Sequence, residues 1–173
     1  MKLKDDKNII LIGMPTSGKT TISARLGERL HKQVLHMDSM IEEELGMSIS
    51  DCFRQYGEDC FRDAETDLIR RICTCRGCVI SCGGGVIKRE VNMKMLSESG
   101  IVFLLRRDFS LLFPTEDRPL SSTREDLEKL YRERKELYRK YNDHVVINNG
   151  TVDETVDEII RILEEEYQEK ERQ

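Results

Sequence analysis

One stretch near the start of the chain constrains the fold more than any other. Residues 8–12, Asn-Ile-Ile-Leu-Ile, predict a buried β-strand. Residues 13–20, Gly-Met-Pro-Thr-Ser-Gly-Lys-Thr, fit the phosphate-binding pattern G-x-x-x-x-G-K-[ST]. Ile22, Leu26 and Leu30 then recur every four residues and predict an amphipathic helix. Strand, loop and helix therefore follow in the order that a nucleoside triphosphate site requires.

The residue types in this loop suit a polyphosphate. Gly13 and Gly18 allow the backbone to turn sharply and to bring N–H groups close to the phosphates. The N-terminus of the following helix adds its unpaired N–H groups and its positive dipole end. Lys19 is expected to contact the β- and γ-phosphates, and the Thr20 hydroxyl to help hold Mg²⁺. The other residues expected to bind the nucleotide are Pro15, Thr16, Ser17 and Thr21.

The alternative for this stretch is a glycine-rich turn before an amphipathic helix, with no ligand. The required order of strand, loop and helix disfavours that alternative. The motif predicts a nucleoside triphosphate, but it does not identify the reaction.

Composition narrows the class of protein. The 173 residues, 38% hydrophobic and 35% charged, suit one soluble domain spanning 1–173. A net charge of -5 argues against nucleic acid or an anionic membrane as the main partner. No apolar run has the length of a membrane span, and the polar residues 1–7 leave no room for a signal peptide. We therefore expect a cytoplasmic protein whose six cysteines are reduced.

Four of the cysteines lie close together in the sequence, at positions 73, 75, 78 and 82. The spacing Cys75-x-x-Cys78 occurs in metal and redox sites. A tetrahedral zinc site usually takes a second such pair or nearby histidines, and none follows here. Cys82 falls in a predicted buried strand, where a thiol packs as a small hydrophobic group.

Strand and helix patterns alternate along the whole chain. Further strands are predicted at 33–37, 78–82, 101–105 and 144–147. Helices are predicted at 39–45, 50–56, 58–73, 89–99, 123–141 and 152–167, with a mobile lid-like loop at about 109–122 and a fraying polar tail at 168–173. This alternation predicts a three-layer α/β/α fold with a five-stranded parallel sheet. Ligands in such folds bind beyond the carboxyl ends of the strands.

The order of several motifs resembles the shikimate kinase family, over about residues 8–167. The motifs are the phosphate loop, Asp38 at the end of the second strand, Phe-Arg-x-x-Glu at 61–65, Gly-Gly-Gly at 83–85, Arg-Pro-Leu at 118–120, and Arg134 followed by Leu-Tyr at 137–138 on a later helix. The phosphate loop occurs in many enzyme families, and the ordered set is far more specific.

The resemblance implies a P-loop kinase of the nucleoside-monophosphate-kinase type that phosphorylates the 3-hydroxyl of shikimate with ATP and Mg²⁺. It also implies a monomer. Asp38 matches the carboxylate that contacts the shikimate hydroxyls, and Arg118 matches the lid arginine that reaches the transferring phosphate. Arg62 and Arg134 match the arginines that hold the shikimate carboxylate. The family's counterparts of Gly83, Gly84 and Gly85 lie against the ring, and that of Glu65 supports the first arginine.

Each of these residues also has a purely structural interpretation. Asp38 is suited to cap the helix predicted at 39–45. Arg62 and Glu65 are spaced as a surface ion pair on one helix, worth only a few tenths of a kcal/mol. Arg134 lies in a highly charged helix, and Arg118 in a loop that is expected to be solvated.

Two departures from the family pattern stand out. His36 occupies the position of a second aspartate that supports Mg²⁺ in the family, so we expect weaker support of the metal here. A further phosphate-contacting arginine before the lid is missing, and Arg106 or Arg107 is left open as its substitute. Two alternatives remain, a related kinase for another polyol acid such as gluconate, and a nucleotide-binding module without turnover. A GTPase is disfavoured because the motif N-K-x-D is absent.

Overall fold

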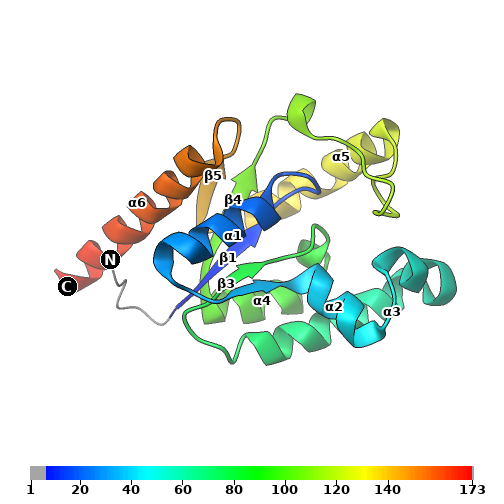
Figure 1. Ribbon diagram of the computed structural model, residues 1–173, viewed down its shortest axis with the longest axis horizontal. Helices are drawn as coiled ribbons and strands as arrows, with labels where there is room; N and C mark the ends of the chain where they lie inside the picture. The colour runs from blue at the N-terminus through cyan, green and yellow to red at the C-terminus, as the bar shows by residue number, and fades with distance from the viewer. Residues whose placement is uncertain (1–6, 173) are drawn as a thin grey trace.

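The computed structural model describes residues 7–172, so most of the polar segment expected at 1–7 lies outside the described residues. A five-stranded parallel sheet forms the centre of the molecule, with helices on both faces (Figure 1). The strands are β1 (Asn8–Ile12), β2 (Val34–His36), β3 (Val79–Ser81), β4 (Gly100–Arg106) and β5 (His144–Ile147). Their order across the sheet is β2-β3-β1-β4-β5, which places the strand before the phosphate loop at the centre.

The helices match the sequence prediction closely. They are α1 (Lys19–Leu30), α2 (Met37–Leu45), α3 (Ile49–Ile72), α4 (Glu90–Ser99), α5 (Arg124–Lys140) and α6 (Val152–Glu171), with short 3-10 turns at η1 (Val86–Lys88) and η2 (Phe109–Leu111). The break predicted between 56 and 58 is present inside α3, because Gly57 has φ 83° and ψ 171°. Only glycine adopts this backbone conformation readily. The three-layer α/β/α prediction is confirmed.

Alternation along β1 divides the core in two. Ile9 and Leu11 pack with residues of α1 and α6 on one face. Ile10 and Ile12 pack with the other face, where α2, α3, α4 and α5 contribute apolar residues. Successive strand residues point to opposite sides, so a strand buried on both faces must be apolar throughout its core positions.

Two local predictions were wrong. The helix after β2 begins at Met37, and His36 is the residue before it, so Asp38 lies inside the first turn and is not the cap. A carboxylate in that turn still interacts favourably with the helix dipole. The tail does not fray from residue 168, because α6 continues to Glu171. Glutamate, glutamine and lysine in this segment are good helix formers, which explains the extension.

Neither a membrane span nor a metal cluster is present in the part of the chain that the structure describes. None of its helices is long and apolar enough to cross a bilayer. Its six cysteines are free thiols. No group of three or more His, Cys, Asp or Glu side chains among residues 7–172 converges to hold a metal ion.

Candidate functional site

The loop after β1 has the backbone geometry of an anion cradle. Gly13 and Gly18 have φ 154° and 97°, and Thr16 has φ 59°. Gly18 is the residue before α1, and no side chain caps that end of the helix. The first N–H groups of α1 are therefore available to an anion, and the positive end of the helix dipole lies behind them.

Lys19 folds back over this loop. Its Nζ donates hydrogen bonds to the Gly13 and Met14 carbonyls at 2.9 and 2.8 Å. The side chain is buried, and burial together with the positive charge of Arg118 lowers the pKa of Lys19 to about 7. A lysine with this pKa is uncharged in much of the population above neutral pH. A phosphate beside it would favour the charged form again.

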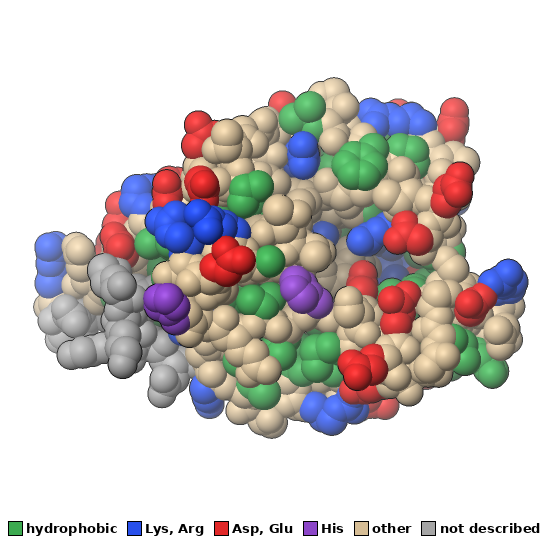
Figure 2. Space-filling view, in the orientation of Figure 1, with side chains coloured by type: hydrophobic (Ala, Val, Ile, Leu, Met, Phe, Trp, Pro, Cys, Tyr) green, Lys and Arg blue, Asp and Glu red, His purple; other side chains and the backbone are tan. Residues whose placement is uncertain are grey.

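A cavity of about 470 Å³ opens beside the loop, at the carboxyl ends of the strands. Figure 2 shows a recess on this face of the molecule, with basic side chains inside it and acidic side chains along its rim. Most of the residues predicted from the sequence line the cavity: Pro15, Thr16, Gly18, Lys19, Thr20, Thr21, Asp38, Arg62, Gly83, Gly84, Gly85, Arg118 and Arg134. Gly13 and Ser17 do not line it. The Gly13 carbonyl accepts from Lys19, and Ser17 is buried behind the loop.

The three consecutive glycines after β3 leave room for site side chains. A Cβ at Gly83 would lie 2.6 Å from Oδ1 of Asp38, and one at Gly85 would lie 2.1 Å from Nη2 of Arg62. A Cβ at Gly84 would lie 3.1 Å from Cδ of Pro15 in the phosphate loop. Each glycine therefore permits a close approach, which a plain turn would not need.

Arg62 is buried in an ion-pair network. Its Nη1 lies 3.1 and 3.0 Å from the two oxygens of Glu65, and its Nε lies 3.1 Å from Glu58. Glu65 is fully buried, and this burial raises the pKa of its carboxyl, while the charge of Arg62 opposes the rise. The surface-pair interpretation of Arg62 is therefore wrong. Removing one partner of a buried pair leaves an uncompensated charge, so the pair fixes the position of Arg62.

Arg134 is also buried, at the wall of the same cavity. None of the described carboxylates lies within 4.0 Å of its guanidinium, in contrast to Arg62. A buried cation without an ion-pair partner is unfavourable unless a ligand supplies the opposite charge. The structure thus brings the two arginines to one cavity and leaves Arg134 with unused positive charge.

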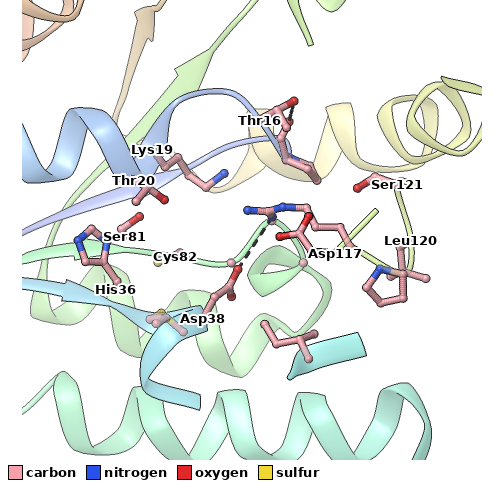
Figure 3. Close-up of a pocket in the computed structure, with 18 of the residues that line it drawn as sticks. Thr16, Lys19, Thr20, His36, Asp38, Ser81, Cys82, Asp117, Leu120 and Ser121 are labelled. Atoms are coloured by element: carbon pink, nitrogen blue, oxygen red, sulfur yellow. Dashed lines mark hydrogen bonds and ion pairs between the residues drawn. The ribbon is translucent and has the colours of Figure 1, made fainter. Parts of the chain in front are cut away.

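Asp38 and Arg118 approach each other across the cavity. Nη1 of Arg118 lies 3.9 Å from Oδ2 of Asp38, and both side chains are 35% exposed (Figure 3). The segment that carries Arg118 is held at two points. The Thr16 hydroxyl bonds the carbonyl and the N–H of Phe113 at 3.0 and 3.1 Å, and the Ser50 hydroxyl donates to the Asp117 carbonyl at 2.8 Å. In this arrangement the loop lies over the phosphate cradle.

Sequence reasoning gave no role to two residues whose hydrogen bonds support the site. The buried Tyr138 hydroxyl bonds the carbonyls of both Gly13 and Gly84. The amide of Asn148 donates to the Ser17 carbonyl at 2.7 Å and accepts from Thr155 at 2.8 Å. Tyr138 belongs to the Leu-Tyr motif that follows Arg134, but the sequence gave no signal for the contacts of its hydroxyl.

For His36, the sequence indicated the position in the site but not the surroundings of the side chain. It lines the cavity at the end of β2, next to Ser81 of β3 in the sheet register (Figure 3). Its Nδ1 is buried and finds no hydrogen-bond partner among the described residues.

Known proteins resemble this chain over nearly its whole length. A family model described as shikimate kinase matches residues 15–164. A shikimate kinase from Clostridium botulinum is 37% identical over 159 residues, covering 90% of this chain and 96% of the relative. A shikimate kinase from Thermodesulfovibrio yellowstonii is 34% identical over 165 residues, covering 91% and 95%.

Solved structures agree with this resemblance. Shikimate kinase from Acinetobacter baumannii, in complex with shikimate, superposes with a TM-score of 0.88 at 28% identity and covers 92% of this chain and 94% of its own. Shikimate kinase from Aquifex aeolicus gives a TM-score of 0.81, also at 28% identity, with coverage of 91% and 96%.

The lowered pKa of Lys19 predicts proton uptake on binding of a nucleoside diphosphate. At pH 8 the free protein holds Lys19 largely uncharged, and a bound phosphate raises its pKa, so about one proton is taken up. At pH 6 Lys19 is already protonated, so its contribution to proton uptake disappears. Calorimetric titration in buffers of different ionisation enthalpy measures the uptake, and Lys19→Met is the control that should abolish it. Equal uptake by Lys19→Met and the parent protein would contradict the assignment.

Proposed function

The chain belongs to the shikimate kinase family, and from this membership we propose how its residues divide the work of the reaction. The protein is an enzyme that transfers the terminal phosphate of ATP to the 3-hydroxyl of shikimate, a step of aromatic amino acid biosynthesis. One observation supports the roles below most directly. The phosphate loop, Asp38 and the two buried arginines all line one cavity.

Arg62 and Arg134 hold the carboxylate of shikimate. The guanidinium group matches a carboxylate with two parallel hydrogen bonds, and Arg134 has no ion-pair partner among the described residues. Glu65 and Glu58 neutralise the charge of Arg62 and orient its guanidinium. The carboxylate of shikimate then supplies the negative charge that would pair with Arg134. Apolar residues around the arginines suit the ring carbons: Ile49, Phe53, Phe61 and Leu130.

Asp38 orients the acceptor hydroxyl, and Arg118 and Lys19 stabilise the transferring group. The hydroxyl oxygen forms the new bond to the γ-phosphorus while the bond to the leaving ADP oxygen breaks. The proton of the hydroxyl passes to the Asp38 carboxylate. Arg118, 3.9 Å from Asp38, is placed to neutralise the charge of the phosphoryl group as it moves between donor and acceptor.

Mg²⁺ fits the donor set here only with the help of the nucleotide. The candidate ligand is the Thr20 hydroxyl, with Asp38 and His36 lining the same cavity. No three acidic, histidine or cysteine side chains within residues 7–172 form a site of their own, as is usual where phosphate oxygens supply most ligands. Bound there, Mg²⁺ would neutralise phosphate charge. His36 is a nitrogen donor whose buried Nδ1 has no partner, and it adds no negative charge.

The remaining proposals concern the protein as a whole. All five strands between residues 8 and 147 belong to one sheet, which supports a single kinase domain at 1–173 with a lid at about 109–122. The net charge of -5 supports a protein that binds neither nucleic acid nor membrane, and the family resemblance supports a cytoplasmic monomer.

Asp38→Asn tests the transfer chemistry. The amide keeps the size of the side chain but cannot accept the proton, so kcat with shikimate should fall by about 10²- to 10⁴-fold. A coupled assay for ADP release measures this, with gluconate as a second acceptor that the parent protein should not phosphorylate. Near-normal kcat would show that Asp38 takes no part in the transfer and has only a structural role in the first turn of α2. Turnover of gluconate at the shikimate rate would contradict shikimate as the specific acceptor.

Arg62→Lys tests the carboxylate clamp. Lysine keeps the charge beside Glu65 but loses the two parallel hydrogen bonds, so KM for shikimate should rise about 10- to 100-fold while KM for ATP stays within about twofold. Steady-state kinetics with each substrate varied in turn provide the measurement. Arg70→Ala, an exposed arginine on the same helix, is the matched control and should change neither value. An equal rise of both KM values would show that Arg62 is structural.

His36→Asp tests the support of the metal. An added carboxylate in the cavity that Thr20 also lines should tighten binding of Mg²⁺ to the protein–ADP complex by about 3- to 10-fold, since a single added charge at a part-exposed site contributes about 1 kcal/mol. Competition with Mn²⁺, followed by electron paramagnetic resonance, measures the affinity without turnover. His36→Asn is the uncharged control. Unchanged affinity in the Asp variant would place the metal away from β2.

A further inference from the structure

Arg107 is a cation of the site to which none of the roles above is assigned. It follows the last residue of β4, at the carboxyl edge of the sheet, and its side chain lines the main cavity. Its Nη1 lies 3.9 Å from the point where a Cβ on Gly18 would stand. Arg107 therefore lies against the N-terminal end of α1. Its neighbour Arg106 is exposed and does not line this cavity.

The guanidinium of Arg107 is incompletely satisfied. Its Nε is buried and has no hydrogen-bond partner in the part of the chain that the structure describes. None of the described carboxylates pairs with it within 4.0 Å, whereas most other arginines of this chain form such pairs, for example Arg25 and Arg161. A buried donor without a partner is unfavourable, and burying part of a charge adds to that penalty.

The surroundings make the position still less favourable for a cation. The positive end of the α1 dipole lies beside Gly18, and Lys19 follows it. A cation is repelled by the positive end of a helix dipole and by a neighbouring lysine, whereas both groups attract an anion. An anion at this point would pair with Arg107 and with the free N–H groups of α1 at the same time.

We propose that Arg107 binds the nucleotide through the phosphate nearest the nucleoside, the α-phosphate. This rests on the proposed function, since it refines how that site holds ATP. Lys19 and Arg118 serve the transferring end, where Arg118 approaches Asp38. Arg107 instead lies beside Gly18 and the loop after β5, where Asn149 accepts from the Asp108 N–H at 3.0 Å and Asn148 bonds Ser17. Arg107 thus supplies the phosphate-contacting arginine that is missing before the lid.

Arg107→Ala tests this proposal, with Arg106→Ala as a control of equal charge one position away. Isothermal titration with ADP, without acceptor, should show about 10- to 100-fold weaker binding for Arg107→Ala and less than about a twofold change for Arg106→Ala. Arg107→Lys should recover part of the affinity. Because Arg107 forms no ion pair with any residue from 7 to 172, its removal should leave the melting temperature of the free protein unchanged or higher, which separates loss of binding from loss of folding.

Three results would overturn the proposal. Equal ADP affinity of Arg107→Ala and the parent protein would exclude a contact, as would an equal loss in both alanine variants. A loss for ADP that is absent for GDP would indicate contact with the adenine ring and not with a phosphate. These measurements need no turnover, so they are independent of the acceptor assay. Failure of the parent protein to phosphorylate shikimate would instead contradict the proposed function.

Discussion

The Tyr138 hydroxyl holds the two halves of the site together. It bonds the carbonyl of Gly13 in the phosphate loop and that of Gly84 in the glycine segment after β3. Burial raises the pKa of Tyr138 to about 12, so the hydroxyl stays protonated and available as a donor. Arg134 lies one helical turn earlier on α5, so the same packing that places the hydroxyl also places the arginine. The Tyr138 hydroxyl thus links the phosphate loop to the glycine segment, in addition to the pairing of β1 with β3 that brings both loops to the same edge of the sheet.

Five basic side chains gather in this cavity beside four acidic ones, Asp38, Glu42, Glu65 and Asp117, although the chain as a whole carries a net charge of -5. Lys19, Arg62, Arg107, Arg118 and Arg134 line it. Arg62 is balanced by buried Glu65, and Lys19 reduces its charge through its lowered pKa. Arg118 faces the Asp38 carboxylate at 3.9 Å, whereas Arg107 and Arg134 have no carboxylate within 4.0 Å among residues 7–172 and depend on substrates for their counter-charges. A site built for two anionic substrates is therefore electrostatically strained when it is empty, and binding relieves that strain.

The sequence predicted the fold well because each element is locally consistent. Apolar runs predicted all five strands, and Gly57 marked the kink in α3. The two errors, the cap at Asp38 and the tail after 167, are at helix ends, where one or two residues of propensity decide the boundary. Of the site, the phosphate loop was recognisable from spacing. The arginines could be identified only through resemblance to a family, since charged residues on helices are common.

The sequence by itself determined the parallel sheet, the phosphate loop after its central strand and the set of residues available at the carboxyl edge, because periodicity and glycine spacing act locally. Only the tertiary structure decided which charges are buried and paired. Arg62 pairs with Glu65, whereas neither Arg134 nor Arg107 has a carboxylate partner among the described residues. The glycines at 83 and 85 leave room for the side chains of Asp38 and Arg62. These outcomes depend on distances between segments far apart in the chain, and burial changes the energy of a charge far more than sequence spacing can indicate.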